Sequence, residues 1–206
     1  MSVSLSKGQK INLSKEQAGL SQVMVGLGWD EVEKNKGFLA TLFGGKPMDI
    51  DCDAFAIMLA ANGKVLNAPL RDIKQCTVFY NNLSDPSKSI VHQGDNLTGA
   101  GEGDDEQIFV DLNRVPADVF SIVFAVNIYE AFNRNQHFGM LRNAFIRVVD
   151  AKSGRELCRF DLNENYNNET ALIAGALRRT DAGWEFVTDG SHSRVKSLVE
   201  VVQSFA

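Results

Sequence analysis

Carboxylates are concentrated in one short, glycine-spaced stretch of the chain. Residues 89–113 contain no Lys or Arg. Six residues there carry a negative charge: Asp95, Glu102, Asp104, Asp105, Glu106 and Asp111. Carboxylates so close in sequence repel one another unless they are protonated, spread into solvent or bridged by a cation. The stretch is therefore a candidate cation site, and a bare solvated loop rich in turn formers is the alternative.

The glycines of this stretch determine what kind of site is possible. Gly94, Gly99, Gly101 and Gly103 permit positive φ, so the backbone can fold back and direct several carbonyls at one point. Carboxylates, the Asn96 amide and backbone carbonyls form an all-oxygen ligand set. Such a set suits a hard divalent cation, Ca2+ before Mg2+, because Ca2+ accepts six to eight oxygens in loose geometry.

A second acidic segment lies more than forty residues upstream. Asp49, Asp51 and Asp53 share one side of an expected strand with the apolar residues of 55–59. If that apolar side is the core, the aspartates stand at its rim and are partly desolvated. A row of carboxylates there is costly without a counter-charge. In a sandwich, strand ends and loops collect at two open edges, so the two acidic segments are expected to meet and to share cations.

Alternating apolar residues predict an all-β chain. The expected strands cover residues 23–29, 51–61, 76–80, 90–93, 107–112, 120–129, 144–150, 156–162, 169–178 and 184–187. Short strands at this spacing are typical of a β-sandwich of two sheets. Only the tail predicts a helix, with Ser191 as N-cap and one apolar face: Val195, Leu198, Val199, Val202 and Phe205. We interpret residues 1–206 as a single mainly β domain with a C-terminal helix.

Composition limits the class of protein. A pI near 5.2 argues against broad electrostatic binding to nucleic acid or anionic lipid. No apolar run approaches the roughly 20 residues of a membrane span, and the amino terminus lacks a signal-peptide apolar region. Cys52, Cys76 and Cys158 form no CxxC pair and are typical of buried thiols in a reducing compartment. The expected location is the cytoplasm.

Several segments together resemble the TerD family of bacterial tellurium-resistance and general stress proteins. The GDNLTG of residues 94–99 and the GDDE of 103–106, followed by an alternating strand, are similar to the family signature. The DIDCDA of 49–54 resembles its upstream Asp-x-Asp motif. Further similar segments are GLGWD at 26–30, FYNN at 79–82, VPAD at 115–118 and NAFIRVVD at 143–150. Family members commonly have Glu-Gly-Asp-Gly where this chain has Ala100-Gly101-Glu102-Gly103, which puts the number of ligands in question.

The resemblance implies Ca2+ binding, and the residues suggest how it would occur. The expected side-chain ligands are Asp51, Asp53, Asp95, Asp104, Asp105 and Glu106, with the amide oxygen of Asn96 and the carbonyls of Leu97 and Gly99. Six carboxylates exceed the charge of one Ca2+, so two adjacent ions are expected. Asp30, Asn81 and Glu102 are candidates of second rank. His92, three residues before Asp95, could line the edge of the site.

The sequence favours a non-enzymatic binding module. Cation binding would order the 94–106 loop and one edge of the sandwich. That edge would then engage other proteins, including a membrane-associated stress-response complex. The resemblance implies a role in tellurite resistance and chemical stress. The rival interpretations are a metal-dependent hydrolase, for which no general base or phosphate-binding Arg is evident beside the carboxylates, and a metal-mediated small-molecule or nucleotide site. The segment 37–45, with Phe38 and Phe43, is a predicted contact surface, and the sequence indicates no oligomeric state.

Overall fold

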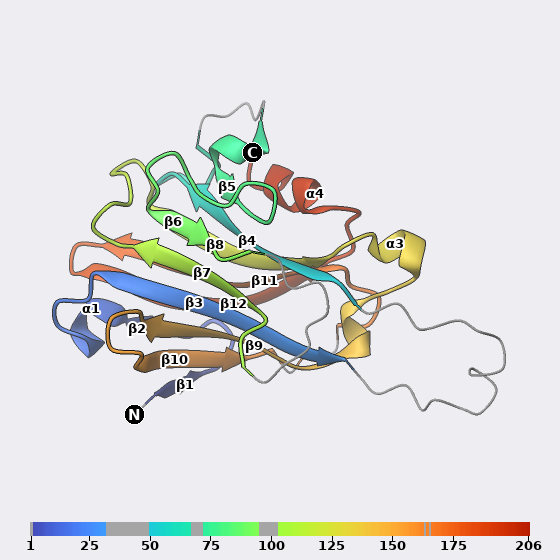
Figure 1. The fold of residues 1–206 in the computed structure, drawn as a ribbon, viewed down its shortest axis with the longest axis horizontal. Helices are drawn as coiled ribbons and strands as arrows, with labels where there is room; N and C mark the ends of the chain where they lie inside the picture. The colour runs from blue at the N-terminus through green and yellow to red at the C-terminus, as the bar shows by residue number, and fades with distance from the viewer. Residues whose placement is uncertain (1, 32–49, 67–71, 95–102, 163, 165) are drawn as a thin grey trace.

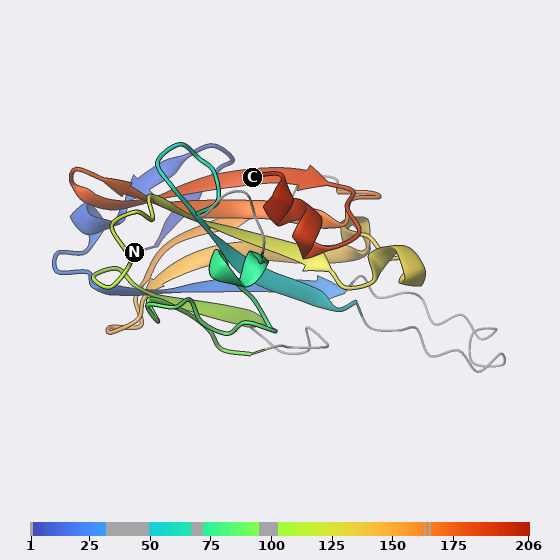
Figure 2. The same cartoon turned by 90° about the horizontal axis from the view of Figure 1, so that it is seen from above.

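The computed structural model describes residues 2–31, 50–66, 72–94, 103–162, 164 and 166–206, and it contains two six-stranded β-sheets packed face to face (Figures 1 and 2). The mainly β sandwich predicted from the sequence is confirmed. The predicted contact surface at 37–45 lies outside these residues.

The first sheet, sheet A, has the strand order β1-β10-β9-β3-β7-β6. Its one parallel pair is β1 with β10, and the other printed pairings are antiparallel. The strands are β1 (Val3–Leu5), β10 (Glu156–Asp161), β9 (Leu141–Asp150), β3 (Gln22–Glu31), β7 (Glu106–Asp111) and β6 (Ile90–His92).

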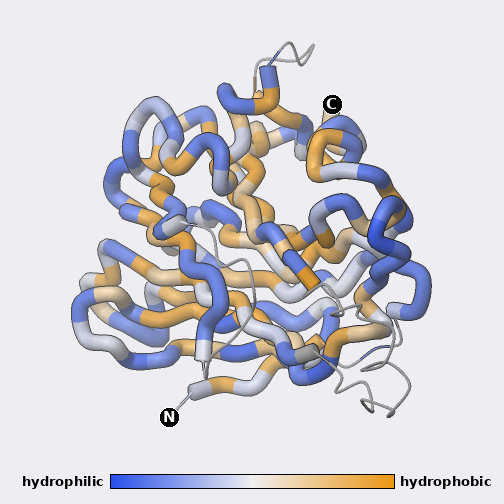
Figure 3. The backbone as a smooth tube through the Cα atoms, turned by 45° about the vertical axis from the view of Figure 1, so that its right-hand side comes forward, coloured by the Kyte–Doolittle hydropathy of each residue, from blue (hydrophilic) through white to orange (hydrophobic). Residues whose placement is uncertain are grey.

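The second sheet, sheet B, has the order β2-β12-β11-β8-β4-β5 and is antiparallel throughout its pairings. The strands are β2 (Lys10–Asn12), β12 (Gly183–Ser193), β11 (Ala171–Thr180), β8 (Ser121–Ile128), β4 (Cys52–Leu59) and β5 (Thr77–Val78). Hydrophobic residues run along the strands of both sheets, while the turns are mostly hydrophilic (Figure 3). This is the distribution expected when two sheets bury their facing sides.

β4 is buried on both faces, and the apolar side with Phe55 is one of two core faces. Cys52, Ala54, Ala56 and Met58 belong to the core between the sheets. The opposite side, with Phe55, Ile57 and Leu59, belongs to a second cluster that includes residues of the C-terminal helix. The aromatic side of β4 therefore faces away from sheet A. Parity alone could not show this, because both sides of the strand are apolar.

The C-terminal helix α4 (Leu198–Gln203) covers this outer face of sheet B (Figure 2). The prediction of Ser191 as its N-cap is wrong, since Ser191 lies in β12 and Ser197 occupies the N-cap. β12 runs further than the apolar pattern indicated. The buried face of α4 consists of Leu198, Val201 and Val202.

Short helical turns interrupt the connections between strands, and only the tail was predicted to be helical. They are α1 (Leu13–Glu16), the 3-10 turns η1 (Ile73–Gln75) and η2 (Phe138–Met140), and α3 (Ala131–Arg134). Such single turns are too short to show an apolar periodicity in the sequence. No helix in the described part of the chain is long and apolar enough to cross a membrane.

One end of the sandwich collects the segments that matter for the site. β3 and β8 finish there, and β4, β7 and β9 begin there, as their registers show. We call it the acidic end, and α3 projects from it at the right of Figure 1. Antiparallel pairing thus brings the start of β4 and the start of β7 to the same end, although they are distant in sequence.

The role of α4 can be tested by paired valine substitutions. Val202→Ala, at a fully buried position, should lower the free energy of unfolding by about 2 kcal/mol because it leaves a cavity under α4. Val199→Ala on the same helix, where Val199 is 37% exposed, should change it by less than about 0.5 kcal/mol. Urea denaturation measures both values. Equal effects would show that α4 does not seal the second cluster.

Candidate functional site

Glu106 joins the two sheets at the acidic end. It is the first residue of β7 in sheet A, and its side chain is fully buried. Its Oε2 accepts a hydrogen bond of 2.6 Å from the backbone N–H of Ala54 on β4 in sheet B. A charged acceptor gives a stronger hydrogen bond than a neutral one. The two acidic segments predicted from the sequence are therefore in direct contact.

His92 completes this buried contact. Its Nδ1 accepts a hydrogen bond from the Gly94 N–H, so the ring proton resides on Nε2. Nε2 lies 3.1 Å from the carbonyl oxygen of Ala54 and 3.4 Å from Oε2 of Glu106. The prediction that His92 lines the edge of the site agrees with this position. The buried imidazole therefore lies directly against the Glu106 carboxylate.

Asp105 is tied to the end of β3. Its backbone N–H donates to the carbonyl of Leu27, and its Oδ2 accepts from the N–H of Trp29 at 2.8 Å. Burial raises the pKa of the Asp105 carboxyl. The hydrogen bond from Trp29 opposes that shift, and the charges of Asp30, Asp104 and Glu106 reinforce it. An ionised Asp105 is thus held in a place that disfavours its negative charge.

The Cys52 thiol is affected by the charges of carboxylates from both acidic segments. Burial raises the pKa of its thiol well above the usual range. The charges of Asp53, Glu106, Asp51 and Asp105 raise it further. Asp51 and Asp53 belong to the first acidic segment, and Asp105 and Glu106 belong to the second. The negative potential at the acidic end is therefore a joint product of the two segments.

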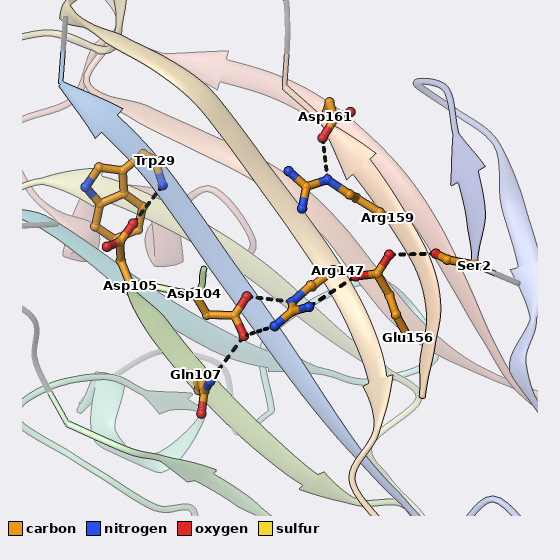
Figure 4. Close-up of polar contacts among 9 residues, drawn as sticks. All are labelled: Ser2, Trp29, Asp104, Asp105, Gln107, Arg147, Glu156, Arg159 and Asp161. Carbon is orange, nitrogen blue, oxygen red and sulfur yellow. Dashed lines mark hydrogen bonds and ion pairs between the residues drawn. The ribbon is translucent and has the colours of Figure 1, made fainter. Parts of the chain in front are cut away.

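Asp104 has a different environment from its neighbours (Figure 4). Its fully buried carboxylate forms a two-pronged ion pair with Arg147 of β9, with Nε–Oδ1 at 2.7 Å and Nη2–Oδ2 at 2.9 Å. Nε2 of Gln107 donates to Oδ2 at 3.1 Å. A Cβ at Gly26 would come within 2.3 Å of this carboxylate, so glycine in β3 makes room for it. Asp104 anchors the start of β7 to the outer face of sheet A.

The Arg147 ion pair continues across the outer face of sheet A. Nη1 of Arg147 lies 3.2 Å from Glu156 Oε2, and Glu156 Oε1 accepts a hydrogen bond of 2.6 Å from Ser2 (Figure 4). The hydrogen bond and charge of Asp104 raise the pKa of Arg147. A polar chain therefore links the segment before β7 to the residues before β1.

Asp51 meets a second arginine. Its Oδ2 lies 3.6 Å from Nη1 of Arg134 on α3, and its carbonyl accepts a hydrogen bond of 2.8 Å from the Tyr129 N–H. The Arg134 contact is an ion pair by distance but lies beyond hydrogen-bond range. The two arginines thus hold their carboxylates with very different geometry.

The TerD domain family matches residues 1–205 of the chain. This chain belongs to the TerD family. Its relatives include the stress response protein SCP2 of Bacillus subtilis (strain 168), which is 43% identical over 205 residues. The alignment covers 100% of this chain and 100% of that protein. The tellurium resistance protein TerD of Alcaligenes sp is 43% identical over 186 residues, covering 90% of this chain and 88% of that protein.

The TerD fold is also seen in a solved structure. A homologue of telluride resistance protein (TerD) from Streptomyces coelicolor A3(2) superposes with a TM-score of 0.63 at 20% identity, covering 91% of this chain and 99% of the other. At that identity the likeness shows the fold alone. The family resemblance drawn from the sequence motifs is confirmed by the family match.

The predicted ligands of this TerD protein fall into three groups. Asp51, Asp53, Asp105 and Glu106 lie at the acidic end, and their charges all act on the Cys52 thiol. Asp104 lies beside them and is held by Arg147. The ligands placed at Asp95, Asn96, Leu97 and Gly99 fall outside the residues that the structure describes, as does Glu102. Within the described ranges, no three or more His, Cys, Asp or Glu side chains are grouped so as to hold a metal ion by themselves.

The candidates of second rank are separated by the structure. Asp30 contributes to the charge around Asp105, and its Oδ2 accepts a hydrogen bond of 2.7 Å from Asn143. Asn81 is an exposed residue of the turn that follows β5. Asp30 therefore shares the environment of the acidic end.

Sequence reasoning missed the arginines. It found no arginine beside the carboxylates, whereas Arg147 and Arg134 both contact them. Arg147 forms an ion pair with the buried carboxylate of Asp104. No spacing in the sequence shows that Arg147 is paired in register with Gly26, the residue that gives Asp104 its space.

The Asp104–Arg147 pair predicts a measurable coupling. Arg147→Met should lower the free energy of unfolding by about 2 kcal/mol, because it leaves a buried carboxylate without its counter-charge at a partly solvated site. A double-mutant cycle with Asp104→Asn should give a coupling of about 1–3 kcal/mol by urea denaturation. The matched control is Arg159→Met on β10, whose partner Asp161 is exposed, with an expected loss below about 1 kcal/mol. Additive effects at 104 and 147 would contradict the anchoring role.

Proposed function

We propose that this TerD protein is a non-enzymatic Ca2+-binding module of the stress-response and tellurium-resistance type. Cation binding orders the acidic end of the sandwich, which then engages a partner protein, including one in a membrane-associated stress-response complex. The observation that carries this proposal is the buried hydrogen bond from the Ala54 N–H to Glu106, which brings the start of β7 against β4 directly beside Asp53. The relatives named for stress response and tellurium resistance support the cellular role.

The chemistry of the donor set fits Ca2+. The converging groups are carboxylates, two of which, on Asp53 and Glu106, belong to residues that are almost completely buried. Carboxylates in such a place are costly without positive charge, and burial raises the pKa of the Asp105 carboxyl in the direction expected from that cost. Asp51, Asp53, Asp105 and Glu106 would hold the ions, two in number, with further oxygens from Asp95, Asn96, Leu97 and Gly99. Bound Ca2+ would add positive charge among these carboxylates.

The role of Asp104 differs from that of a simple ligand in this proposal. Both of its carboxylate oxygens are engaged by Arg147 and Gln107. Its ion pair with Arg147 fixes the start of β7, next to Asp105, which is bonded to Trp29, and Glu106, which is bonded to Ala54. Asp104 therefore supports the site by position and contributes less to the charge that a cation must balance.

The arginines also bear on the hydrolase alternative. A hydrolase of phosphoesters needs a free positive group to bind phosphate beside the metal. Arg147, the arginine in closest contact with this stretch, is held by the carboxylates of Asp104 and Glu156 instead. The structure thus supports a binding module over a hydrolase, and a metal-mediated small-molecule site remains an outcome of the titrations below.

Trp29 provides a direct reporter for cation binding. Its backbone N–H donates a hydrogen bond to the Asp105 carboxylate. Trp184 lies at the start of β12, where its backbone N–H donates to Ser14. In a Trp184→Phe background, Ca2+ should change the Trp29 fluorescence with saturation, and Mg2+ should do so more weakly. The same addition should raise the free energy of unfolding by about 4 kcal/mol at a thousandfold excess over Kd. No response to Ca2+ by either measurement would overturn the proposed function.

A second test asks whether both acidic segments bind the same cations. Asp53→Asn and Asp105→Asn should each weaken Ca2+ binding by tenfold or more, since each removes one charged ligand. In chelator, Asp105→Asn should be at least as stable as the wild type, because it removes a charge that its surroundings disfavour. Asp181→Asn, an exposed carboxylate in the turn between β11 and β12, is the control with the same charge change. Isothermal titration calorimetry and urea denaturation measure these effects.

The enzyme alternative has its own measurement. A phosphoester substrate panel, assayed with Ca2+ and Mg2+, should show no turnover above the Asp105→Asn background. Turnover that disappears in that variant would favour the hydrolase over the binding module.

A further inference from the structure

α3 is a single helical turn placed directly against the candidate cation site. The residues on either side of it, Glu130 and Asn135, both have φ of 50°, in the left-handed region. Asn tolerates this conformation, but Glu does so at a cost. The turn is therefore bounded by two backbone positions whose conformation is held by the surrounding contacts.

Arg134 is the cationic residue of this turn, and its contacts are loose. Nη1 lies 3.6 Å from Asp51, Nε lies 3.8 Å from Glu130, and the guanidinium lies 5.1 Å from the Tyr129 ring centroid. Nε makes no hydrogen bond with the described residues. Arg147 instead approaches Asp104 to 2.7 Å with two parallel bonds. Arg134 is held by charge and by the aromatic face, without the directional bonds that would fix it.

We propose that Arg134 is a built-in counter-cation that competes with Ca2+ for Asp51, and that α3 transmits the occupancy of the site to the surface. This inference rests on the proposed Ca2+ function. In the cation-free protein, Arg134 offsets the charge of Asp51. A divalent ion bound to Asp51 repels the guanidinium and weakens its hold, because like charges at short range in a partly buried site are poorly screened.

The position of α3 explains how occupancy would reach the surface. The Tyr129 N–H is bonded to the Asp51 carbonyl, so the segment entering α3 is fixed to β4. Beyond that point, Phe132 of α3 is 43% exposed, and Arg194 lies 5.2 Å from its ring centroid. When Arg134 releases Asp51, the turn can move about its two left-handed ends and change how this exposed ring is presented. A protein partner that contacts α3 would then distinguish the two states.

The test compares two arginine substitutions at the acidic end. Arg134→Gln should lower the Kd for Ca2+ by about tenfold in isothermal titration calorimetry, because it removes the competing charge. Arg142→Gln is the matched control for net charge. Arg142 is exposed on β9, pairs in register with Asp30, and makes no ion pair with a described residue. It should change the Kd by less than about threefold. Arg134→Lys keeps the charge and should have a Kd near that of the wild type. This control separates the effect of the lost charge from any structural effect of substitution at position 134.

Hydrogen exchange adds a readout that affinity alone does not provide. The amides of Arg134 and Gln136 donate to Glu130 and Ala131 within the turn. Ca2+ should accelerate their exchange in the wild type and leave it unchanged in Arg134→Gln, where the turn is already released. Equal Kd values for the Gln variants at 134 and 142, or a weaker Kd at 134, would overturn this inference while the Ca2+ function stands. Absence of Ca2+ binding in the wild type would overturn both.

Discussion

The hydrogen bond from the Ala54 backbone to the buried Glu106 carboxylate is the contact on which the acidic end depends. It crosses from one sheet to the other at the point where β4 and β7 both begin. A carboxylate there loses its hydration and is contacted by a backbone N–H and by the neighbouring His92. Closing the sandwich thus brings negative charge into a region of low polarity. Arginines near this end of the sandwich offset part of the resulting free-energy cost.

The two arginines represent two different responses to this cost. Arg147 removes one carboxylate from the cluster by a close, two-pronged ion pair on the outer face of sheet A. Arg134 stands at a longer distance from Asp51, with Nη1 3.6 Å from Oδ2. A close pair fixes structure, whereas a loose pair can be exchanged. The same residue type therefore supports the site in one place and regulates it in the other.

The glycines of β3 connect the fold to the site. At Gly26 and Gly28 a side chain would collide with Asp104 and with the Phe145 ring and Gly103 carbonyl, respectively. The outer face of β3 is left bare so that the segment leading into β7 can lie across it. In the sequence these glycines interrupt an otherwise regular strand, which is a sign of close approach by another part of the chain. The TerD family likeness of this segment thus has a steric reason.

Much of the fold followed from the sequence. Period-two alternation determined most of the strands, because a half-buried strand must place apolar residues on one side. Residues such as Val23, Val25 and Leu27 do lie in the core. The eleven-residue length of β12, the turn at α3 and the outward direction of Phe55 did not follow, since none changes the local pattern. The acidic residues were recognised from their density alone.

The amino-acid sequence by itself determined the chemistry of the site, which is a set of carboxylates in two segments. Within each segment the carboxylates are close enough to repel one another. Only the tertiary structure decided which of them converge and which are already compensated. Asp104 and Asp105 are adjacent in sequence, yet one faces Arg147 and the other is bonded to Trp29. Successive residues entering a strand point to opposite sides, so their partners come from different neighbouring elements. That separation depends on sheet order and register, which no local pattern of residues specifies.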